Sequence, residues 1–280
     1  MPTEEHDLKK TPPVEQPPQA KPSPKEVLGS GATPAPASAA QVPSGTMRMD
    51  LHCHSEASAD CRTPLKALLE RALAKGIQVQ AITDHNEIWG ALKLRELAQG
   101  TPLTVIVGEE VSTREGEIIG LFLHEKIPAG LRPEETVERI KAQGGLVLLP
   151  HGFDPLKRHR LHPLALQRVA DQIDVVESFN AHISRPTWNR RAAQWAKERG
   201  LPVSAGSDAH TLVSIGAAWV QTPARAVQTP QDLLAALREG TVMGEWTHPA
   251  WAFVLKMWDF GRRRLARLTN PEMAEAVDGR

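Results

Sequence analysis

Residues 47–54 read MRMDLHCH, an expected strand that ends in two histidines. His52 and His54 are two residues apart, so both imidazoles lie on the same side of a strand and can hold one metal ion. Cys53 lies between them and is expected to point to the opposite face, into the core. Imidazoles accompanied by carboxylates rather than thiolates favour Zn²⁺, Mn²⁺ or Fe²⁺.

Similar polar clusters follow other apolar runs of the chain. Each stands at, or just after, the C-terminal end of an expected strand. In a barrel of alternating strands and helices these ends meet on one face, where active sites are built. The sequence therefore predicts a shared metal site. The clusters are Asp84-His85, Glu109-Glu110, His151, and Asp208 with His210.

Short apolar runs alternate with amphipathic stretches from residue 47 onward. This alternation predicts an α/β fold with a parallel sheet, and about seven units favour a closed barrel over an open sheet. The expected strands are 47–53, 79–83, 103–107, 118–123, 146–149, 175–179, 203–205 and 217–221. The expected helices are 63–75, 87–98, 133–144, 186–199 and 231–238.

Composition divides the chain into three parts. Residues 1–46 hold ten of the 23 prolines, many alanines and few large apolar side chains, which predicts a disordered tail. A docking arm for a partner is the alternative. Residues 47–240 are the expected barrel, and residues 241–280 form a short helical extension rich in aromatic and basic side chains.

The composition of all 280 residues excludes several classes of protein. Lysine plus arginine equals aspartate plus glutamate at 33 each, which argues against a protein that coats nucleic acid. Two cysteines, Cys53 and Cys61, fit a reducing compartment. No apolar run approaches the roughly 20 residues that span a bilayer, and the N-terminus lacks the apolar stretch of a secretory signal. We therefore expect a cytoplasmic protein with no transmembrane segment.

Five ordered motifs resemble the PHP (polymerase and histidinol phosphatase) domain. They are DLHCHS at 50–55, TDHN at 83–86, GEEVS at 108–112, PH at 150–151 and GSDAH at 206–210. The resemblance covers roughly residues 47–222. It implies a distorted (β/α)7 barrel with a di- or trinuclear metal site that hydrolyses phosphate esters.

The resemblance also implies which residues bind metal. Glu110, rather than Glu109, matches the family's bridging glutamate, and alternation along the strand keeps only one of the two facing the metals. Asp60 matches a further ligand position. Asp84 is expected to accept a hydrogen bond from a ligating imidazole. The implied ligands are His52, His54, Asp60, His85, Glu110, His151, Asp208 and His210.

The sequence departs from the family pattern at two places. Ile118 stands where some relatives carry a histidine, so two metals are a safer expectation than three. After the strand near residue 175, where many members have another ligand, the chain has Asn180 and His182. His182 is expected to complete a third site or to bind the substrate phosphate, and Asn180 can bind the phosphate too. Alternatively, this loop only orders the helix behind it.

A mechanism follows from such a site. Two cations a few ångströms apart lower the pKa of a bridging water, so hydroxide is available near neutral pH. They also neutralise phosphoryl oxygens in the transition state. The candidates for the general acid are Asp208, His210 and His182, and those for binding the substrate phosphate are Arg158, Arg160, Arg185 and Asn180.

Residues 246–267 combine three tryptophans and two phenylalanines with four arginines. A C-terminal helix that packs on the barrel is the plain interpretation. A nucleic-acid strand bound by stacking and charge, or an interfacial membrane helix, are the alternatives. The aromatic and basic residues meant here are Trp246, Trp251, Phe253, Trp258, Phe260, Arg262, Arg263, Arg264 and Arg267.

The function expected from all of this is that of a metal-dependent phosphoesterase acting on a small phosphorylated metabolite or nucleotide. One alternative is a PHP exonuclease or polymerase-associated module that acts on nucleic-acid ends. Another is a metal-bound scaffold without catalysis. A third, hydrolysis of C–N bonds, is disfavoured by the arginine candidates, because a neutral amide has no use for three cations.

Overall fold

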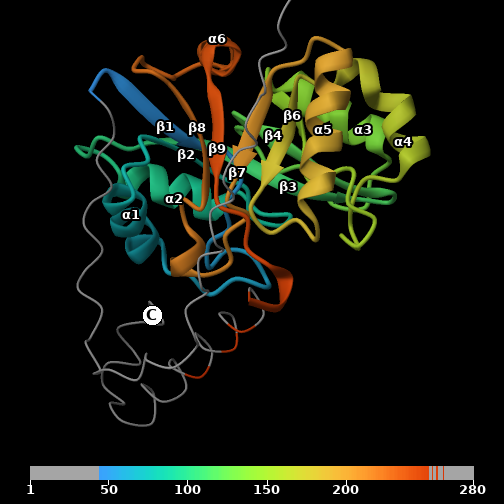
Figure 1. Ribbon diagram of the computed structural model, residues 1–280. Coiled ribbons are helices and arrows are strands. Elements are labelled where there is room, and N and C mark those ends of the chain that lie inside the picture. Colours follow the sequence, from blue (N-terminus) through green and yellow to red (C-terminus); the bar gives the residue numbers. More distant parts are fainter. Residues whose placement is uncertain (1–43, 252–253, 255–256, 258–260, 262–280) are drawn as a thin grey trace, which may run out of the picture. The chain divides into compact units, whose positions relative to one another are not determined.

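The computed structural model describes residues 44–251 together with residues 254, 257 and 261. Strands and helices alternate along most of this range, although β4 follows β3 directly (Figure 1). The strands are β1 (Thr46–Asp50), β2 (Val79–Ile82), β3 (Thr104–Thr113), β4 (Gly116–Leu121), β5 (Leu146–Leu149), β6 (Val175–Asn180), β7 (Val203–Gly206), β8 (Ala218–Pro223) and β9 (Thr241–Gly244). The α-helices are α1 (Leu65–Ala74), α2 (Trp89–Leu97), α3 (Pro133–Ala142), α4 (Pro163–Val169), α5 (Pro186–Glu198) and α6 (Pro230–Glu239).

Proline and glycine set the ends of several helices. The helices α3, α4, α5 and α6 each begin at a proline, whose fixed φ suits the first helical turn and whose missing N–H is not needed there. The chain leaves α1 and α3 through Gly76 and Gly144, which have φ values of 69° and 72°. This left-handed conformation carries little steric cost for glycine.

The strands form one sheet in the order β7-β6-β5-β4-β3-β2-β1-β8-β9. Neighbours among β1, β2 and β3, and among β5, β6 and β7, are parallel. However, β4 is antiparallel to both of its neighbours, and so are the pairs that β8 makes with β1 and β9. The expected parallel sheet is therefore wrong for these strands. Only Arg114 and Glu115 separate β3 from β4, whereas a parallel crossover needs a dozen or more residues.

The sheet closes into a distorted barrel beside β1, as predicted. Four of the five residues of β1, Thr46–Met49, pair with β8, whereas the residues directly after β1 bond to residues at and just after the end of β7. The backbone N–H of Leu51 donates to the carbonyl oxygen of Ala205 (3.1 Å), and that of Asp208 donates to His52 (2.8 Å). We call this junction the seam. It brings the C-terminal ends of β1 and β7 together.

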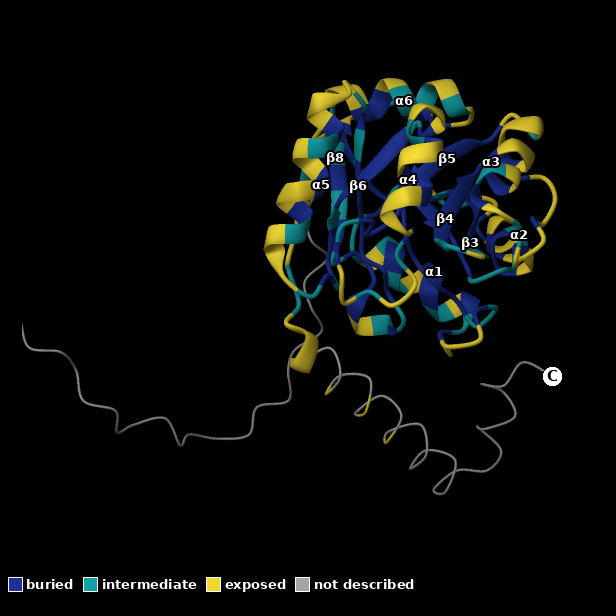
Figure 2. Cartoon of the chain, turned by 90° about the vertical axis from the view of Figure 1, so that its right-hand side faces the viewer, coloured by how far each residue is buried: buried dark blue, intermediate teal, exposed yellow. Residues whose placement is uncertain are grey.

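Two apolar clusters lie on the two faces of the sheet. One cluster consists of side chains at alternate strand positions, such as Met49, Leu121 and Leu148, and includes residues of α6. The other consists of side chains at the intervening positions, such as Ile82 and Ile118, which pack under the helices. Figure 2 shows buried strands covered by helices whose outward faces are exposed. This burial fixes the register of each strand, because a slip of one residue would exchange the two faces.

The last described part of the chain returns to the barrel. Strand β9 begins at Thr241, so the sheet continues into residues 241–244, where a helical extension was expected. The indole N–H of Trp246 then donates to the carbonyl oxygen of Ile183 (2.8 Å).

No helix in the described ranges combines the length and the apolar character that a membrane span requires. The predicted tail up to residue 43 and the residues Phe253, Trp258, Phe260, Arg262, Arg263, Arg264 and Arg267 lie outside the described residues.

Candidate metal centre

Four buried side chains converge on one point, two from the residues after β1, one from within β3 and one from just after β7. The Nε2 atoms of His52 and His54 are 3.2 Å apart, and Glu110 and Asp208 each direct one carboxylate oxygen at both of them. The histidine-to-carboxylate distances are between 3.2 and 3.5 Å. Ligands at about 2.0–2.2 Å from a tetrahedral ion lie about 3.3–3.6 Å apart, so this donor set fits one divalent cation.

A second group shares Glu110 with the first. The other oxygen of Glu110 lies 3.0 Å from Nε2 of His151, and the carboxylate of Glu117 lies 3.9 Å from the same nitrogen. Glu117 also lies 3.5 Å from Nδ1 of His85. A carboxylate shared between two groups is suited to bridge two cations. Glu117 was not predicted. The histidine of some relatives was matched to its neighbour Ile118, whose side chain is buried in the apolar cluster that packs under the helices.

The third group is more open to solvent. The imidazole of His54 lies between those of His85 and His210, with ring centroids 4.6 and 4.3 Å away. Asp60, whose side chain is 47% exposed, places one oxygen 2.9 Å from Nε2 of His210 and the other 3.9 Å from Nε2 of His85. Three histidines and a carboxylate are donors that Zn²⁺, Mn²⁺ and Fe²⁺ accept. The groups with ligand atoms close enough for one ion are His54-His85-His210, His52-His54-Glu110, His52-His151-Asp208 and Glu110-Glu117-His151.

The buried charges shift the pKa values of these side chains in opposite directions. Burial disfavours a charged imidazole, but the carboxylates of Glu110, Glu177 and Asp208 raise the pKa of His52 well above its ordinary value. Burial alone would raise the pKa of Glu110, but His52 and His151 hold it well below its usual range. In the metal-free centre, protonated imidazoles balance the charge of the buried carboxylates. A divalent cation takes over this role when it binds, and the imidazoles must lose these protons to become ligands.

Sequence matches place the chain in a family. The PHP domain model matches residues 50–169, and a model described as PHP-associated matches residues 186–242. An uncharacterized protein of Methanocaldococcus jannaschii is 43% identical over 148 residues, which are 49% of this chain and 83% of that protein. The chain belongs to the PHP family. A second uncharacterized protein of the same organism is 37% identical over 190 residues, which are 67% of this chain and 75% of that protein.

Other PHP relatives carry functional descriptions. A protein of Haemophilus influenzae named 5'-3' exoribonuclease is 36% identical over 104 residues, covering 35% of this chain and 38% of that one. Among solved structures, a two-domain protein of Bacteroides vulgatus described as containing a predicted PHP-like metal-dependent phosphoesterase superposes with a TM-score of 0.58. That match is 21% identical and covers 77% of this chain and 70% of the other. It shows that the two proteins share the fold.

Buried Glu177 orients two members of the PHP centre and was not predicted. One of its oxygens lies 2.9 Å from Nδ1 of His52, and the other accepts the backbone N–H of His151 (2.7 Å). An imidazole that donates through Nδ1 keeps Nε2 free for a metal. Gly206 makes room for this contact, because a Cβ there would lie 2.3 Å from the Glu177 carboxylate. The signal available in the sequence was a glutamate directly after the apolar pair Val175 and Val176 in an expected strand.

Asp84 supports the centre differently from the prediction. Its carboxylate accepts the backbone N–H of Ser55 (2.6 Å) and the hydroxyl of Ser55 (2.7 Å) rather than a hydrogen bond from an imidazole. It thereby fixes the turn after the first histidine pair. Within that turn the Ser58 hydroxyl lies 3.2 Å from Nδ1 of His54. Asp84 thus orients an imidazole through the loop.

Two residues expected near the phosphate contact the ligand Asp208. The side-chain amide of Asn180 donates to Glu177 (3.0 Å) and to Oδ2 of Asp208 (3.1 Å), so its donors are already used within the protein. The Nδ1 atom of His182 lies 2.9 Å from the carbonyl oxygen of Asp208. Lys157, which was not predicted, lies 2.5 Å from Oδ2 of Asp208.

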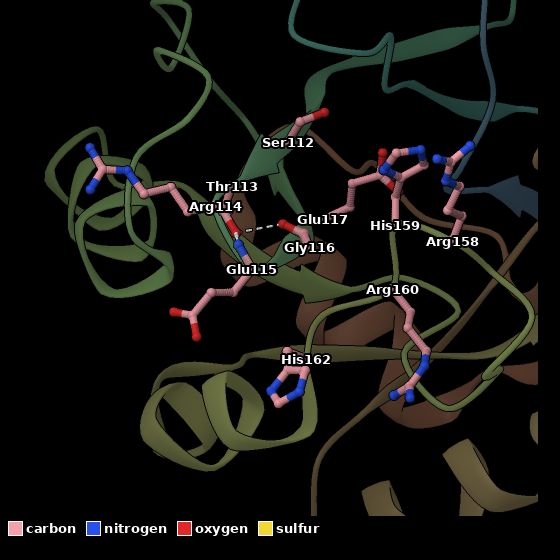
Figure 3. Close-up of a pocket in the computed structure, with 10 residues that line it drawn as sticks. All are labelled: Ser112, Thr113, Arg114, Glu115, Gly116, Glu117, Arg158, His159, Arg160 and His162. Carbon is pink, nitrogen blue, oxygen red and sulfur yellow. Dashed lines mark hydrogen bonds between the residues drawn. The ribbon is translucent and has the colours of Figure 1, made fainter.

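The three arginine candidates are not gathered at the metals. Arg158 and Arg160 line a pocket next to the tip of the β3–β4 hairpin, where their guanidinium groups point apart (Figure 3). Arg185 is exposed at the residue before α5.

Two candidate ligands have unusual backbones, since φ is 26° at His151 and 49° at Asp208. Positive φ in residues other than glycine costs energy and is concentrated at functional sites.

Proposed function

We propose that this protein is a metal-dependent phosphoesterase that hydrolyses a phosphate ester of a small metabolite or nucleotide with two or three divalent cations. The observation that carries the proposal is the sharing of Glu110 between two histidine-containing groups. Bound divalent cations supply Lewis-acid charge to the phosphoryl oxygens and lower the pKa of a coordinated water. The proposed ligands are His52, His54, Asp60, His85, Glu110, Glu117, His151, Asp208 and His210.

Residues beside these ligands are placed to bind a phosphoryl oxygen and to donate a proton to the leaving group. Lys157 adds a fixed positive charge beside Asp208, where it can bind a phosphoryl oxygen. His182 is the proposed proton donor to the leaving alkoxide, because it is not one of the proposed metal ligands, whereas Asp208 and His210 are. Burial lowers the pKa of His182, which makes its protonated form a stronger acid.

The experiment is Mn²⁺-dependent hydrolysis of p-nitrophenyl phosphate beside bis-p-nitrophenyl phosphate. Wild-type protein is expected to turn over one of them only when metal is present, and the preferred substrate distinguishes a monoesterase from a diesterase. Asp208→Asn should abolish turnover, whereas Asp171→Asn, at an exposed site in the turn after α4, should not. Failure of the metal-loaded wild type to turn over either compound would favour a scaffold or a nucleic-acid substrate.

An exonuclease that acts on nucleic-acid ends is the second candidate. The named activity of the Haemophilus influenzae relative supports it, although the match covers 38% of that protein. A single-stranded oligonucleotide should then inhibit the hydrolysis of p-nitrophenyl phosphate, and the inhibition should weaken steeply with rising salt. Inhibition that does not respond to salt would argue against this candidate.

A further inference from the structure

The chain leaves the barrel through a helix that begins at Pro249, and its described residues are 249–251, 254, 257 and 261. We call it the C-terminal helix. The segment before it is bonded to the barrel, because the backbone N–H of Thr247 donates to the carbonyl oxygen of Ala181 (2.9 Å) and the indole N–H of Trp246 donates to that of Ile183 (2.8 Å). Both acceptors lie in the loop after β6. The start of the helix is therefore fixed to the barrel.

Three large apolar side chains of the C-terminal helix are open to solvent. Trp251, Val254 and Met257 are 59%, 48% and 51% exposed. These positions are three residues apart, so the side chains are neighbours along one side of the helix. A helix that packs this side on the barrel would bury them. The residues that the structure describes therefore leave this apolar face largely uncovered.

The sequence that carries this face has an excess of positive charge. Residues 249–267 hold five basic side chains and one acidic side chain, whereas the whole chain holds 33 of each kind. Four of the five basic residues are arginines, and they follow the exposed apolar face within residues 262–267. A surface that suits this segment must combine negative charge with an apolar layer.

We propose that the C-terminal helix binds this protein to the surface of an anionic phospholipid membrane. Trp251, Val254 and Met257 would enter the boundary between headgroups and acyl chains, and the charge of the arginines would attract the segment to anionic headgroups. Such a helix lies in the membrane surface and does not have to cross the bilayer. The aliphatic side chains favour lipid over a nucleic-acid strand, because bases stack on aromatic rings. This inference does not depend on the proposed phosphoesterase function.

Co-sedimentation of the full chain with phospholipid vesicles tests the inference. One set of vesicles is pure phosphatidylcholine, and the other is phosphatidylcholine mixed with phosphatidylserine. Wild-type protein should bind the mixed vesicles at least about tenfold more tightly than the neutral ones, and added salt should weaken this preference. Equal sedimentation with both sets, or with neither, would overturn the inference.

A triple variant tests the apolar face. Trp251→Ser/Val254→Ser/Met257→Ser should bind the mixed vesicles at least about tenfold more weakly than the wild type, because its apolar contact with the lipid is lost. Its matched control replaces three exposed apolar side chains outside the C-terminal helix, Trp89→Ser, Leu97→Ser and Leu164→Ser. The control should bind as the wild type does, and an equal loss in both triple variants would contradict the proposal. Circular dichroism checks that each variant is folded.

A second triple variant tests the charge. Arg262→Gln/Arg263→Gln/Arg264→Gln should lose at least about tenfold in binding to the mixed vesicles, with little change on the neutral ones. The control removes the same charge at exposed sites on α1, α2 and α3, through Lys66→Gln, Arg95→Gln and Arg139→Gln. An arginine variant that keeps wild-type binding to the mixed vesicles would overturn the assignment to anionic lipid.

Three further outcomes would assign the segment differently. Asp208→Asn should bind the mixed vesicles normally, and a loss there would mean that the metal centre holds the lipid instead. Binding of a single-stranded oligonucleotide that depends on the arginines, with no binding to vesicles, would assign the segment to nucleic acid. A dimer in light scattering that the Trp251 triple variant dissociates, again without vesicle binding, would show that a second copy of the chain covers the face.

Discussion

The ammonium of Lys157 lies 2.5 Å from Oδ2 of Asp208, while Oδ1 of the same carboxylate faces the imidazoles of His52 and His54. Burial would lower the pKa of this lysine, but Asp208 raises it, so the side chain stays charged. Asp208 is thus shared between a fixed organic cation and the proposed metal ions. A phosphoryl oxygen that reaches the centre meets positive charge from both.

Replacing Lys157 should therefore impair catalysis more than metal loading. We expect Lys157→Met to lower kcat/KM for p-nitrophenyl phosphate by about 10²-fold, because a preorganised charge beside the phosphoryl group is lost. The Mn²⁺ content, measured by elemental analysis, should stay that of the wild type. Lys66→Met, at an exposed site on α1, serves as the control. A kcat/KM close to that of the wild type would remove Lys157 from the mechanism.

Glu117 should behave as a metal ligand. In the metal-free protein, burial and then the charges of Glu110 and Asp208 raise its pKa to about 9, so its carboxyl is mostly protonated at pH 7. Glu117→Gln resembles that protonated form and should leave the metal-free melting temperature at pH 7 nearly unchanged. The variant should lose at least about tenfold in affinity for one Mn²⁺ ion, as measured by calorimetry.

The control for this experiment is Glu125→Gln, which changes an exposed glutamate outside the centre. It should match the wild type in both the melting temperature and the metal titration. A Glu117→Gln variant that binds the same number of Mn²⁺ ions with wild-type affinity would contradict the role of Glu117 as a ligand.

Glu109 should make the stability of the protein depend on pH. Burial raises its pKa from 4.5 to about 7, against the lowering effect of the hydrogen bond from Ile127 N–H, and its second oxygen has no partner among the described residues. Because the pKa is higher in the folded state, stability is intact below pH 4.5 and falls as the pH rises through 7. Glu109→Gln cannot ionise and should escape this loss.

Urea unfolding at two pH values measures this difference. Relative to the wild type, Glu109→Gln should gain about 1–3 kcal/mol of unfolding free energy between pH 5 and pH 8. Glu138→Gln, at an exposed site on α3, should gain nothing. A gain that is the same at both pH values would mean that Glu109 does not ionise in this range.

The directions of side chains that follow from alternation along a single strand could be predicted from the sequence. His52 and His54 face one way, and Glu110 faces the metals while Glu109 does not, because successive side chains on a strand point to opposite faces. The position of Glu117 depends instead on how β4 pairs with β3. The two-residue turn places Glu117 opposite Ser112, on the same face as Glu110, and this register could not be read from an apolar pattern alone.

Loop residues were the least predictable part of the centre. Lys157, Arg158 and Arg160 lie within four residues of one another, yet Lys157 reaches Asp208 and the two arginines line the neighbouring pocket. A loop has no side-chain period from which such directions follow. The chemistry of arginine suggested phosphate binding, but only the folded chain separates Arg158 and Arg160, which line a pocket, from Arg185, which does not line it.

Gly116 offers a separate test of how the pocket is built. Gly116→Ala combines a φ of 119° with a Cβ that would contact the Arg160 carbonyl oxygen, so the loop must move. Gly130→Ala has a similarly left-handed φ of 74° but meets nothing within 4 Å. Chemical unfolding should show a loss of about 1 kcal/mol for Gly130→Ala and clearly more for Gly116→Ala. Equal losses would mean that the close approach at Gly116 contributes nothing.

The seam between β1 and β7 has a consequence for biosynthesis. It joins His52, near the beginning of the barrel, to Asp208, more than 150 residues later in the chain. A nascent chain that still holds residues 205–210 inside the ribosome carries most of the histidines but cannot close the barrel around them. The complete donor set can therefore assemble only after residues 205–210 have left the ribosome, whereas the groups His52-His54-Glu110 and Glu110-Glu117-His151 contain no residue beyond 151.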